Sequence, residues 1–514
     1  MNETGEKAMK VHLKGTMFFL IGTIIAKILS YTYRAIIARS LSVEDFGTFN
    51  LVITVAAIAA LIANLGLSQG MERFLGYFSQ DKKRTHTIIT FALKVVIPLS
   101  ILIALLIAYF SKDIAVSFFH AEEMAVLIKI IAIGIPFYTI TELNEGIFKG
   151  SKNLKYQIYT SDIIENLIRL TITILALLLG YQLMGVVYAY IFSLMASAIT
   201  GYYIIRKKIL PRENLEKKHA RSLQKEIMLF SWPAMFTIWL YTATKWTDTL
   251  LLGFLDTRTN VGLYNAALPI AAALTIIYTA LGSLLIPVLS ELHKNNEKNL
   301  LKELFVRINR WGVIVTLPIF LVVILFPHQV IQLLFGEKYL AAASALIILA
   351  LGYFFGVMCG QVGALMNVLG KTKERMIIWL SGGIFSVTLN ALLIYKYGLI
   401  GAAIATALTF FYLNIATTLY LWKYHQVRNE NRKLIKPFLA GILAMIPLFI
   451  WLRFNPQSSG YAFAIAAVLS GTLYLIIALL IRSFDKEDVQ LMTMLENKTG
   501  YKMTKIKNIL EKYT

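Results

Sequence analysis

The feature that most constrains this chain is a succession of long apolar runs separated by short polar connectors. A helix of about twenty apolar residues is long enough to cross the hydrocarbon core of a bilayer. Because only helices and closed barrels satisfy all their backbone polar groups in lipid, the runs predict an all-α polytopic membrane protein. They predict about fourteen transmembrane helices, with approximate cores at 15–37, 46–68, 87–110, 124–147, 158–180, 185–205, 228–252, 261–286, 311–334, 341–366, 376–395, 399–422, 437–453 and 460–481.

The composition supports this assignment. The 514 residues are 57% apolar and 15% charged, whereas a soluble domain is about 45–50% apolar and about 25% charged. The first run is too long for the apolar region of a signal peptide and contains Lys27 and Arg34, so we expect it to be retained. A single cysteine, Cys359, excludes a disulfide framework and a cysteine-based metal site.

The distribution of basic residues predicts the orientation. If the N-terminus is cytoplasmic, the inner segments hold 38 of the 50 Lys and Arg residues, the outer loops hold six, and six lie within spans. This asymmetry follows the positive-inside rule and places both termini in the cytoplasm, with the protein in the plasma membrane. The net charge of +21 then reflects topology and contact with anionic lipids, and no nucleic-acid partner is expected.

An internal repeat divides the chain. The segment Phe46-Gly47-Thr48-Phe49-Asn50 matches Val261-Gly262-Leu263-Tyr264-Asn265, 215 positions later. Further matches at similar spacings pair Phe119 with Phe335, Gly150 with Gly370, and Leu183-Met184-Gly185 with Leu399-Ile400-Gly401. Because six spans return the chain to the same side, the two copies are parallel repeats, as in transporters that move two lobes around a central site.

The repeat predicts the domain organisation. The predicted parts are an N-lobe over 1–205, a basic cytoplasmic linker over 206–227, a C-lobe over 228–422, two extra spans over 423–481 and a basic cytoplasmic tail over 482–514. The tail forms either an amphipathic helix on the membrane surface or a solvated extension.

The chain resembles a known family. The stretch ARSLSVEDFGTFN over 38–50, the stretch GMERF over 70–74 and the six-plus-six-plus-two order of helices are similar to polysaccharide (Wzx-type) flippases. These belong to the multidrug/oligosaccharidyl-lipid/polysaccharide exporter superfamily, which includes the MATE exporters. The resemblance implies a cationic cavity and alternating-access transfer of a polyprenyl-pyrophosphate-linked oligosaccharide from the cytoplasmic to the outer leaflet, for surface glycan assembly.

Charged residues within the spans are candidate substrate ligands, because each costs about 2.5–3.5 kcal/mol at a helix centre. Lys27, Tyr31 and Arg34 share one helical face, where a guanidinium and an ammonium could bind a pyrophosphate. Arg34 could instead extend to lipid headgroups. Lys245, 218 positions after Lys27, is expected to face it from the seventh span.

Two asparagines complete the candidate substrate site. Asn50 and Asn265 are equivalent in the repeat. Their amides are suited to hydrogen bonds with sugar hydroxyls, or equally with neighbouring helices.

Acidic residues are candidates for coupling or gating. Asp162, Glu165 and Arg169 follow one another on the fifth span, where Glu165 and Arg169 are spaced for an intrahelical ion pair. Glu142 and Glu145 lie near the cytoplasmic end of the fourth span. These residues form a structural or gating cluster, or they bind a coupling proton or sodium ion. Asp248 either neutralises Lys245, or it titrates or binds a coupling cation when the lobes move.

No enzyme activity and no cofactor beyond a coupling Na⁺ or H⁺ are expected. The chain has no Walker loop, no HExxH and no G-x-S-x-G motif. We expect it to act as a monomer on a lipid-linked oligosaccharide, beside other polysaccharide-assembly membrane proteins. The alternatives are a peptidoglycan-precursor lipid flippase and a cation-coupled multidrug exporter. A membrane glycosyltransferase or polymerase is disfavoured, because such enzymes need a substantial outer loop.

Overall fold

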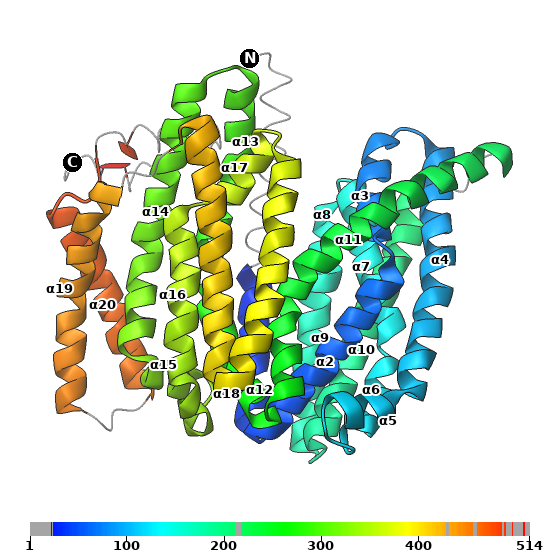
Figure 1. The fold of residues 1–514 in the computed structure, drawn as a ribbon, viewed down its shortest axis with the longest axis horizontal. Coiled ribbons are helices and arrows are strands. Elements are labelled where there is room, and N and C mark those ends of the chain that lie inside the picture. Colours follow the sequence, from blue (N-terminus) through cyan, green and yellow to red (C-terminus); the bar gives the residue numbers. More distant parts are fainter. Residues whose placement is uncertain are drawn as a thin grey trace. The chain divides into compact units, whose positions relative to one another are not determined.

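The computed structural model describes residues 22, 24–210, 217–427, 431–455, 460–485, 488–489, 496 and 507–508. All regular structure in these residues is helical, as the sequence predicts (Figure 1). Contacts between residues divide the chain into two compact units, with the boundary between Gly262 and Leu263. We call the part from residue 22 to Gly262 the N-unit and the part from Leu263 onward the C-unit.

The N-unit is built around α7. It begins with a helix over residues 24–40 and continues with α2 (Val43–Asn64), α3 (Leu67–Tyr77), α4 (Lys82–Tyr109), α5 (Ser111–Asp113), η1 (Ile114–Phe118), α6 (Met124–Ala132), α7 (Ile135–Gly150), α8 (Leu154–Gln157), η2 (Ile158–Ile164), α9 (Glu165–Leu178), α10 (Gln182–Ile204), η3 (Ile205–Ile209) and α11 (Lys217–Leu255). Helix α7 packs against α2, α3, α4 and α10.

Two glycines let α7 approach α3 at backbone distance. A Cβ atom at Gly146 would lie 2.4 Å from the carbonyl oxygen of Ser68, and one at Gly150 would lie 2.4 Å from that of Met71. Small residues allow such close approach between membrane helices. The backbone contact brings the polar side chains of α3 and α7 together.

The C-unit continues the chain through a second set of helices. It comprises the remainder of α12 (Arg258–Ala273), then α13 (Ile276–Lys294), α14 (Lys298–Leu325), α15 (Pro327–Leu334), η4 (Glu337–Ala342), α16 (Ala343–Cys359), α17 (Val362–Val368), α18 (Thr372–His425), η5 (Asn431–Leu434), α19 (Ile435–Phe454) and α20 (Gly460–Leu480). Helix α16 packs against α14 and α18, while α19 and α20 pack against each other and against α14.

The helix positions agree with the predicted spans, but they do not by themselves give the number of membrane crossings. By length and composition, eight of the described helices are able to cross a membrane, or ten if two bent pairs each count as one span. Helix α18 contains two predicted spans, 376–395 and 399–422, joined at Gly398, whose φ of 51° and ψ of −128° suit only glycine. The count of fourteen therefore stays a prediction.

The unit boundary differs from the lobe boundary that the repeat predicts. Helix α11 begins at Lys217, inside the predicted linker, and contacts α2, α3 and α4 of the N-unit. The predicted seventh span therefore packs with the N-unit in this structure. The division into an N-lobe and a C-lobe stays a prediction from the sequence. Residues 211–216, the start of the first span and most of the predicted tail lie outside the described residues.

The structure corrects one match of the repeat. Gly150 lies within α7, whereas Gly370 follows α17 with a φ of 73°. The structural equivalent of Gly370 is Lys152, with a φ of 57°. In both copies the next backbone N–H closes the helix end, from Asn153 to the Phe148 carbonyl at 2.9 Å and from Lys371 to the Met366 carbonyl at 2.8 Å.

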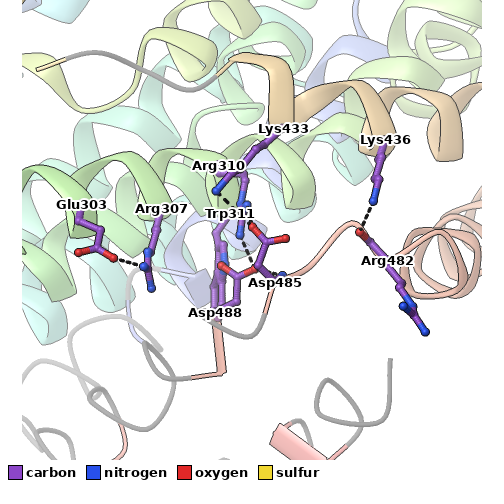
Figure 2. Close-up of polar contacts among 9 residues, drawn as sticks. All are labelled: Glu303, Arg307, Arg310, Trp311, Lys433, Lys436, Arg482, Asp485 and Asp488. Atoms are coloured by element: carbon purple, nitrogen blue, oxygen red, sulfur yellow. Dashed lines mark hydrogen bonds and ion pairs between the residues drawn. The ribbon is translucent and has the colours of Figure 1, made fainter. Parts of the chain in front are cut away.

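A buried ionic cluster fastens the segment after α20 to α14 (Figure 2). Arg310 of α14 is 7% exposed and forms ion pairs with Asp488, which is fully buried, and with Asp485 at 2.6 Å. The indole Nε1 of Trp311 donates to Asp488 Oδ1 at 2.8 Å. Lys433, before α19, lies 3.4 Å from Asp485. The cluster therefore joins three separate segments of the C-unit.

The charges of Arg310 and Lys433 keep Asp485 ionised. Burial alone would raise the pKa of Asp485, but hydrogen bonds and charges from Arg310 and Lys433 outweigh burial and hold the pKa below its usual range. A lowered pKa in the folded state stabilises the fold at neutral pH, and this contribution is lost as the pH falls through that pKa.

We predict that Arg310→Ala strongly destabilises the C-unit, because it leaves the buried Asp488 carboxylate without its cation. Loss of one partner of a buried ion pair costs about 3–5 kcal/mol. The measurement is the midpoint of thermal unfolding of the purified protein. Lys371→Ala is the control, because Lys371 and Glu374 form an exposed pair 4.0 Å apart, worth less than about 1 kcal/mol. Equal shifts in the two variants would contradict the prediction.

Candidate functional site

A buried ion pair lies in the interior of the N-unit. Arg169 and Glu165 of α9 form the ion pair that their spacing predicts, with each side chain 12% exposed. Arg169 Nε also donates to the hydroxyl of Ser193, in α10, at 3.1 Å. The positive charge of Arg169 is therefore balanced by a carboxylate and held in place from a second helix.

Aromatic rings surround this guanidinium. Arg169 Cζ lies 4.5 Å from the ring centroid of Tyr190 and 5.7 Å from that of Tyr33. Phe49 of α2 packs edge-on against both tyrosine rings, at 6.1 and 6.4 Å. The cluster joins the helix over residues 24–40 to α2, α9 and α10. The sequence analysis did not select Tyr33, Tyr190 or Ser193, because aromatic and small polar residues are common in membrane helices.

Arg34 belongs to the same cluster and carries the unbalanced charge. It is partly buried, and the groups that act on it electrostatically are Tyr31, Tyr33, Tyr190 and Arg169. Among the described residues, no carboxylate forms an ion pair with Arg34. Because Glu165 already neutralises Arg169, the cluster keeps a net positive charge. A guanidinium in this setting is suited to bidentate binding of a phosphate group.

Lys27 and Tyr31 differ in environment although they share a helical face with Arg34. Lys27 is exposed and Tyr31 is partly buried. Lys27 acts electrostatically on Asp162 of η2, as do Glu145 and Glu165. The N-unit therefore holds side chains of both signs of charge near Asp162.

A polar cavity of about 190 Å³ lies at the cytoplasmic end that the charge distribution predicts for α7. Its lining comes from the end of α2 and from α3, α7 and α11, and includes Asn64, Ser68, Gln69, Glu72, Glu142, Glu145 and Lys149. The cavity therefore brings together three acidic side chains and one lysine within the N-unit.

Hydrogen bonds hold Glu142 at this cavity. Asn64 Nδ2 donates to Glu142 Oε2 at 3.4 Å, and Ser68 Oγ donates to the Glu142 carbonyl at 2.9 Å. Asn64 is itself fixed, because its Oδ1 accepts the Ser68 N–H at 3.0 Å. Among the described residues Glu142 has this amide donor and forms no ion pair, so protonation would change its charge without breaking an ion pair.

Glu145, one turn nearer the end of α7, has different partners. It forms an ion pair with Lys149 at 3.5 Å and accepts a hydrogen bond from Gln157 Nε2 at 3.2 Å. In the part of the chain that the structure describes, no three His, Cys, Asp or Glu residues are grouped as metal ligands.

The other candidate residues lie elsewhere. Asn50 is buried in α2 and donates to the Phe46 carbonyl of its own helix at 2.7 Å. Asn265 is buried in α12. Asp248 is buried in α11 and accepts the Thr249 N–H at 2.8 Å. The Lys245 side chain lies outside the described residues, so its pairing with Asp248 and its facing of Lys27 stay predictions.

A comparison with models of protein families shows which family the chain belongs to. Residues 12–293, more than half of its length, match the family model described as polysaccharide biosynthesis protein. The chain belongs to this family. Residues 233–392 also match the MatE model, in agreement with the predicted exporter superfamily.

Relatives in the family come from archaea and bacteria. An uncharacterized membrane protein of Methanocaldococcus jannaschii is 26% identical over 85% of this chain and 89% of the relative. A putative O-antigen transporter of Shigella flexneri is 22% identical over 76% of this chain and 93% of the relative. A probable low-salt glycan biosynthesis flippase of Haloferax volcanii, Agl15, is 22% identical over 81% and 88%.

Solved structures share the fold. The inward closed conformation of the lipid II flippase MurJ matches with a TM-score of 0.70 and 18% identity, over 91% of this chain and 99% of that structure. An inward-facing multidrug resistance MATE family transporter matches with a TM-score of 0.61 and 16% identity, over 77% and 93%. At these identities the likeness shows the fold alone. The two family-model matches place the chain in the multidrug/oligosaccharidyl-lipid/polysaccharide exporter superfamily.

Proposed function

We propose that this chain is a flippase that moves a polyprenyl-pyrophosphate-linked oligosaccharide from the cytoplasmic to the outer leaflet of the plasma membrane. The observation that carries the proposal is Arg34, a partly buried cation without an ion pair among the described residues. A charge held inside a helical membrane unit is costly unless an anion balances it. A pyrophosphate linkage supplies two negatively charged groups of this kind.

The names of two relatives support a glycan as cargo. One is a putative O-antigen transporter and another a probable glycan biosynthesis flippase. In the proposed cycle the head group is attracted from the cytoplasm by Lys27, Arg34 and Lys245, while the polyprenyl chain stays in lipid. No covalent bond is made or broken, and alternating access moves the head group outward.

The first experiment compares a strain lacking this gene with its parent. We expect one lipid-linked oligosaccharide to accumulate on the cytoplasmic leaflet, and the intact gene to relieve the accumulation. Accumulation of a peptidoglycan precursor would favour a lipid II flippase instead. An unchanged pool with new sensitivity to cationic drugs would overturn the proposal in favour of a multidrug exporter, whose cargo would meet Glu142, Glu145 and Asp162.

We predict that Arg34→Ala reduces flipping in proteoliposomes by about tenfold or more, since a hydrogen bond to a charged group contributes about 1.5–3 kcal/mol. The probe is polyprenyl-pyrophosphate-linked N-acetylglucosamine. Arg34→Lys should recover part of the activity, because lysine keeps the charge but loses the bidentate geometry. Lys94→Ala is the control, as Lys94 is an exposed cation of α4. Parental activity in Arg34→Ala would remove Arg34 from the substrate site.

We also propose that Glu142 couples transport to a proton or sodium gradient, together with Glu145, Asp162 and Glu165. Glu142→Gln keeps the hydrogen-bonding shape but removes the ionisable group. We predict that this variant flips the probe at a rate independent of an imposed pH or sodium gradient, whereas the parent responds to one of them. Glu72→Gln is the control, because Glu72 lines the same cavity but is exposed. A full gradient response in Glu142→Gln would assign Glu142 a structural role.

A further inference from the structure

The strongest match of the internal repeat is duplicated in three dimensions at the starts of α2 and α12. The N–H of Asp45 is capped by the hydroxyl of Ser42 at 3.0 Å. The N–H of Asn260 is capped in the same way by the hydroxyl of Thr257 at 3.3 Å. Ser42 and Thr257 are 215 positions apart, the same spacing as Gly47 and Gly262. Both helices therefore begin with the same local structure.

The two helix starts contact each other reciprocally through their glycines. A Cβ atom at Gly47 would lie 1.9 Å from the carbonyl oxygen of Arg258. A Cβ atom at Gly262 would lie 2.1 Å from the carbonyl oxygen of Val43. Val43 and Arg258 are again 215 positions apart. Each repeat copy thus presents the same surface to the other, as the two sides of a two-fold symmetric interface do.

We call this contact, made by Val43, Gly47, Arg258 and Gly262, the glycine crossing. All four residues belong to the N-unit. Because glycine has no side chain, the backbones meet directly at these positions. Separating them leaves no interlocked side chains at the glycines to repack, so the crossing is suited to opening and closing.

Charged groups flank the glycine crossing. Arg258 forms an ion pair with Glu44, in the first turn of α2, and another with Glu123, just before α6, at 2.7 Å. Arg258 is 21% exposed, whereas Glu44 and Glu123 are 51% and 65% exposed. Ion pairs this accessible contribute about 0.2–1 kcal/mol each. The ion pairs orient the glycine crossing, and water can solvate the carboxylates of Glu44 and Glu123 when the crossing opens.

The carboxylate of Glu123 is ionised at neutral pH. A hydrogen bond from its own backbone and then one from Arg258 lower the pKa of the Glu123 carboxyl. The ion pair between Arg258 and Glu123 is therefore present under physiological conditions.

We propose that the glycine crossing, with its Glu44–Arg258–Glu123 ion pairs, is a latch that closes the outer end of the transport path and opens once in each cycle. This inference rests on the proposed function and on the predicted orientation, which places Arg39 and Arg258 on the outer side. The latch gives a role to the two glycines of the duplicated segment. Each repeat contributes one glycine and one backbone carbonyl to the closed contact.

The test locks the latch covalently. In a Cys359→Ser background, Glu44→Cys and Arg258→Cys are joined by a short crosslinker that contains a reducible disulfide. The probe is polyprenyl-pyrophosphate-linked N-acetylglucosamine in proteoliposomes. We expect flipping to fall to background after crosslinking and to return after reduction. Undiminished flipping by the crosslinked protein would overturn the latch.

A matched pair controls for the crosslinking chemistry. Lys112 and Glu122 form an exposed ion pair at 2.8 Å on the same expected face, and among the described residues neither forms an ion pair with Arg258. Lys112→Cys with Glu122→Cys, crosslinked in the same way, should keep its flipping activity. Equal loss of flipping in both crosslinked pairs would show a general effect of the chemistry and would overturn the latch.

A second measurement tests the latch independently of the proposed cargo. If the uncrosslinked protein moves no probe, the proposed function fails, while the latch is still tested by thiol accessibility. Leu41→Cys, next to the cap of α2, is buried in the closed state. Gly47→Ala should hold the crossing apart and speed labelling of this cysteine by a membrane-impermeant maleimide added outside. Gly471→Ala is the control, because a Cβ there meets nothing within 4 Å. Equal labelling rates in the two variants would overturn the latch.

Discussion

A buried ionised side chain must be balanced by another part of the protein, and this constraint governs both units. In the N-unit, Glu165 neutralises Arg169, and Ser193 holds the guanidinium from a second helix. In the C-unit, Arg310 is balanced by two aspartates of the segment after α20. Arg34 stands apart from this pattern, since the described residues supply it with tyrosine rings but no carboxylate. Binding of an anionic head group would provide the missing balance.

The same constraint explains why the two appended helices are part of the C-unit rather than an independent hairpin. Helices α19 and α20 have large apolar faces, and many of their side chains are exposed in the protein alone. Their attachment depends on specific contacts with α14. The Tyr474 hydroxyl donates to the Ile314 carbonyl at 2.9 Å within the apolar region, and the Arg310 cluster holds the segment beyond α20 (Figure 2).

Glycine serves two purposes in the N-unit. Gly146 and Gly150 bring α7 against α3, and this contact builds a polar cavity that the carboxylates of α7 line. Gly47 and Gly262 bring the starts of the two repeats together and create a contact suited to separation. The sequence identified the second pair by its repetition. The sequence analysis matched Gly150 with Gly370. In the structure the left-handed residue that ends the helix is Lys152 in the first copy and Gly370 in the second, so these two residues are equivalent.

The sequence by itself determined the class of this protein, the positions of its helices and the pairing of Glu165 with Arg169. These follow from local rules, namely the length of apolar runs and the i, i+4 spacing of a helix. Tertiary structure decided which charges remain unbalanced, which glycines meet, and that the seventh span packs with the N-unit. Such outcomes depend on contacts between residues far apart in the chain, such as Arg169 with Tyr33 or Arg310 with Asp488. No local pattern encodes them, because each arises only when separate helices pack and exclude lipid from the space between them.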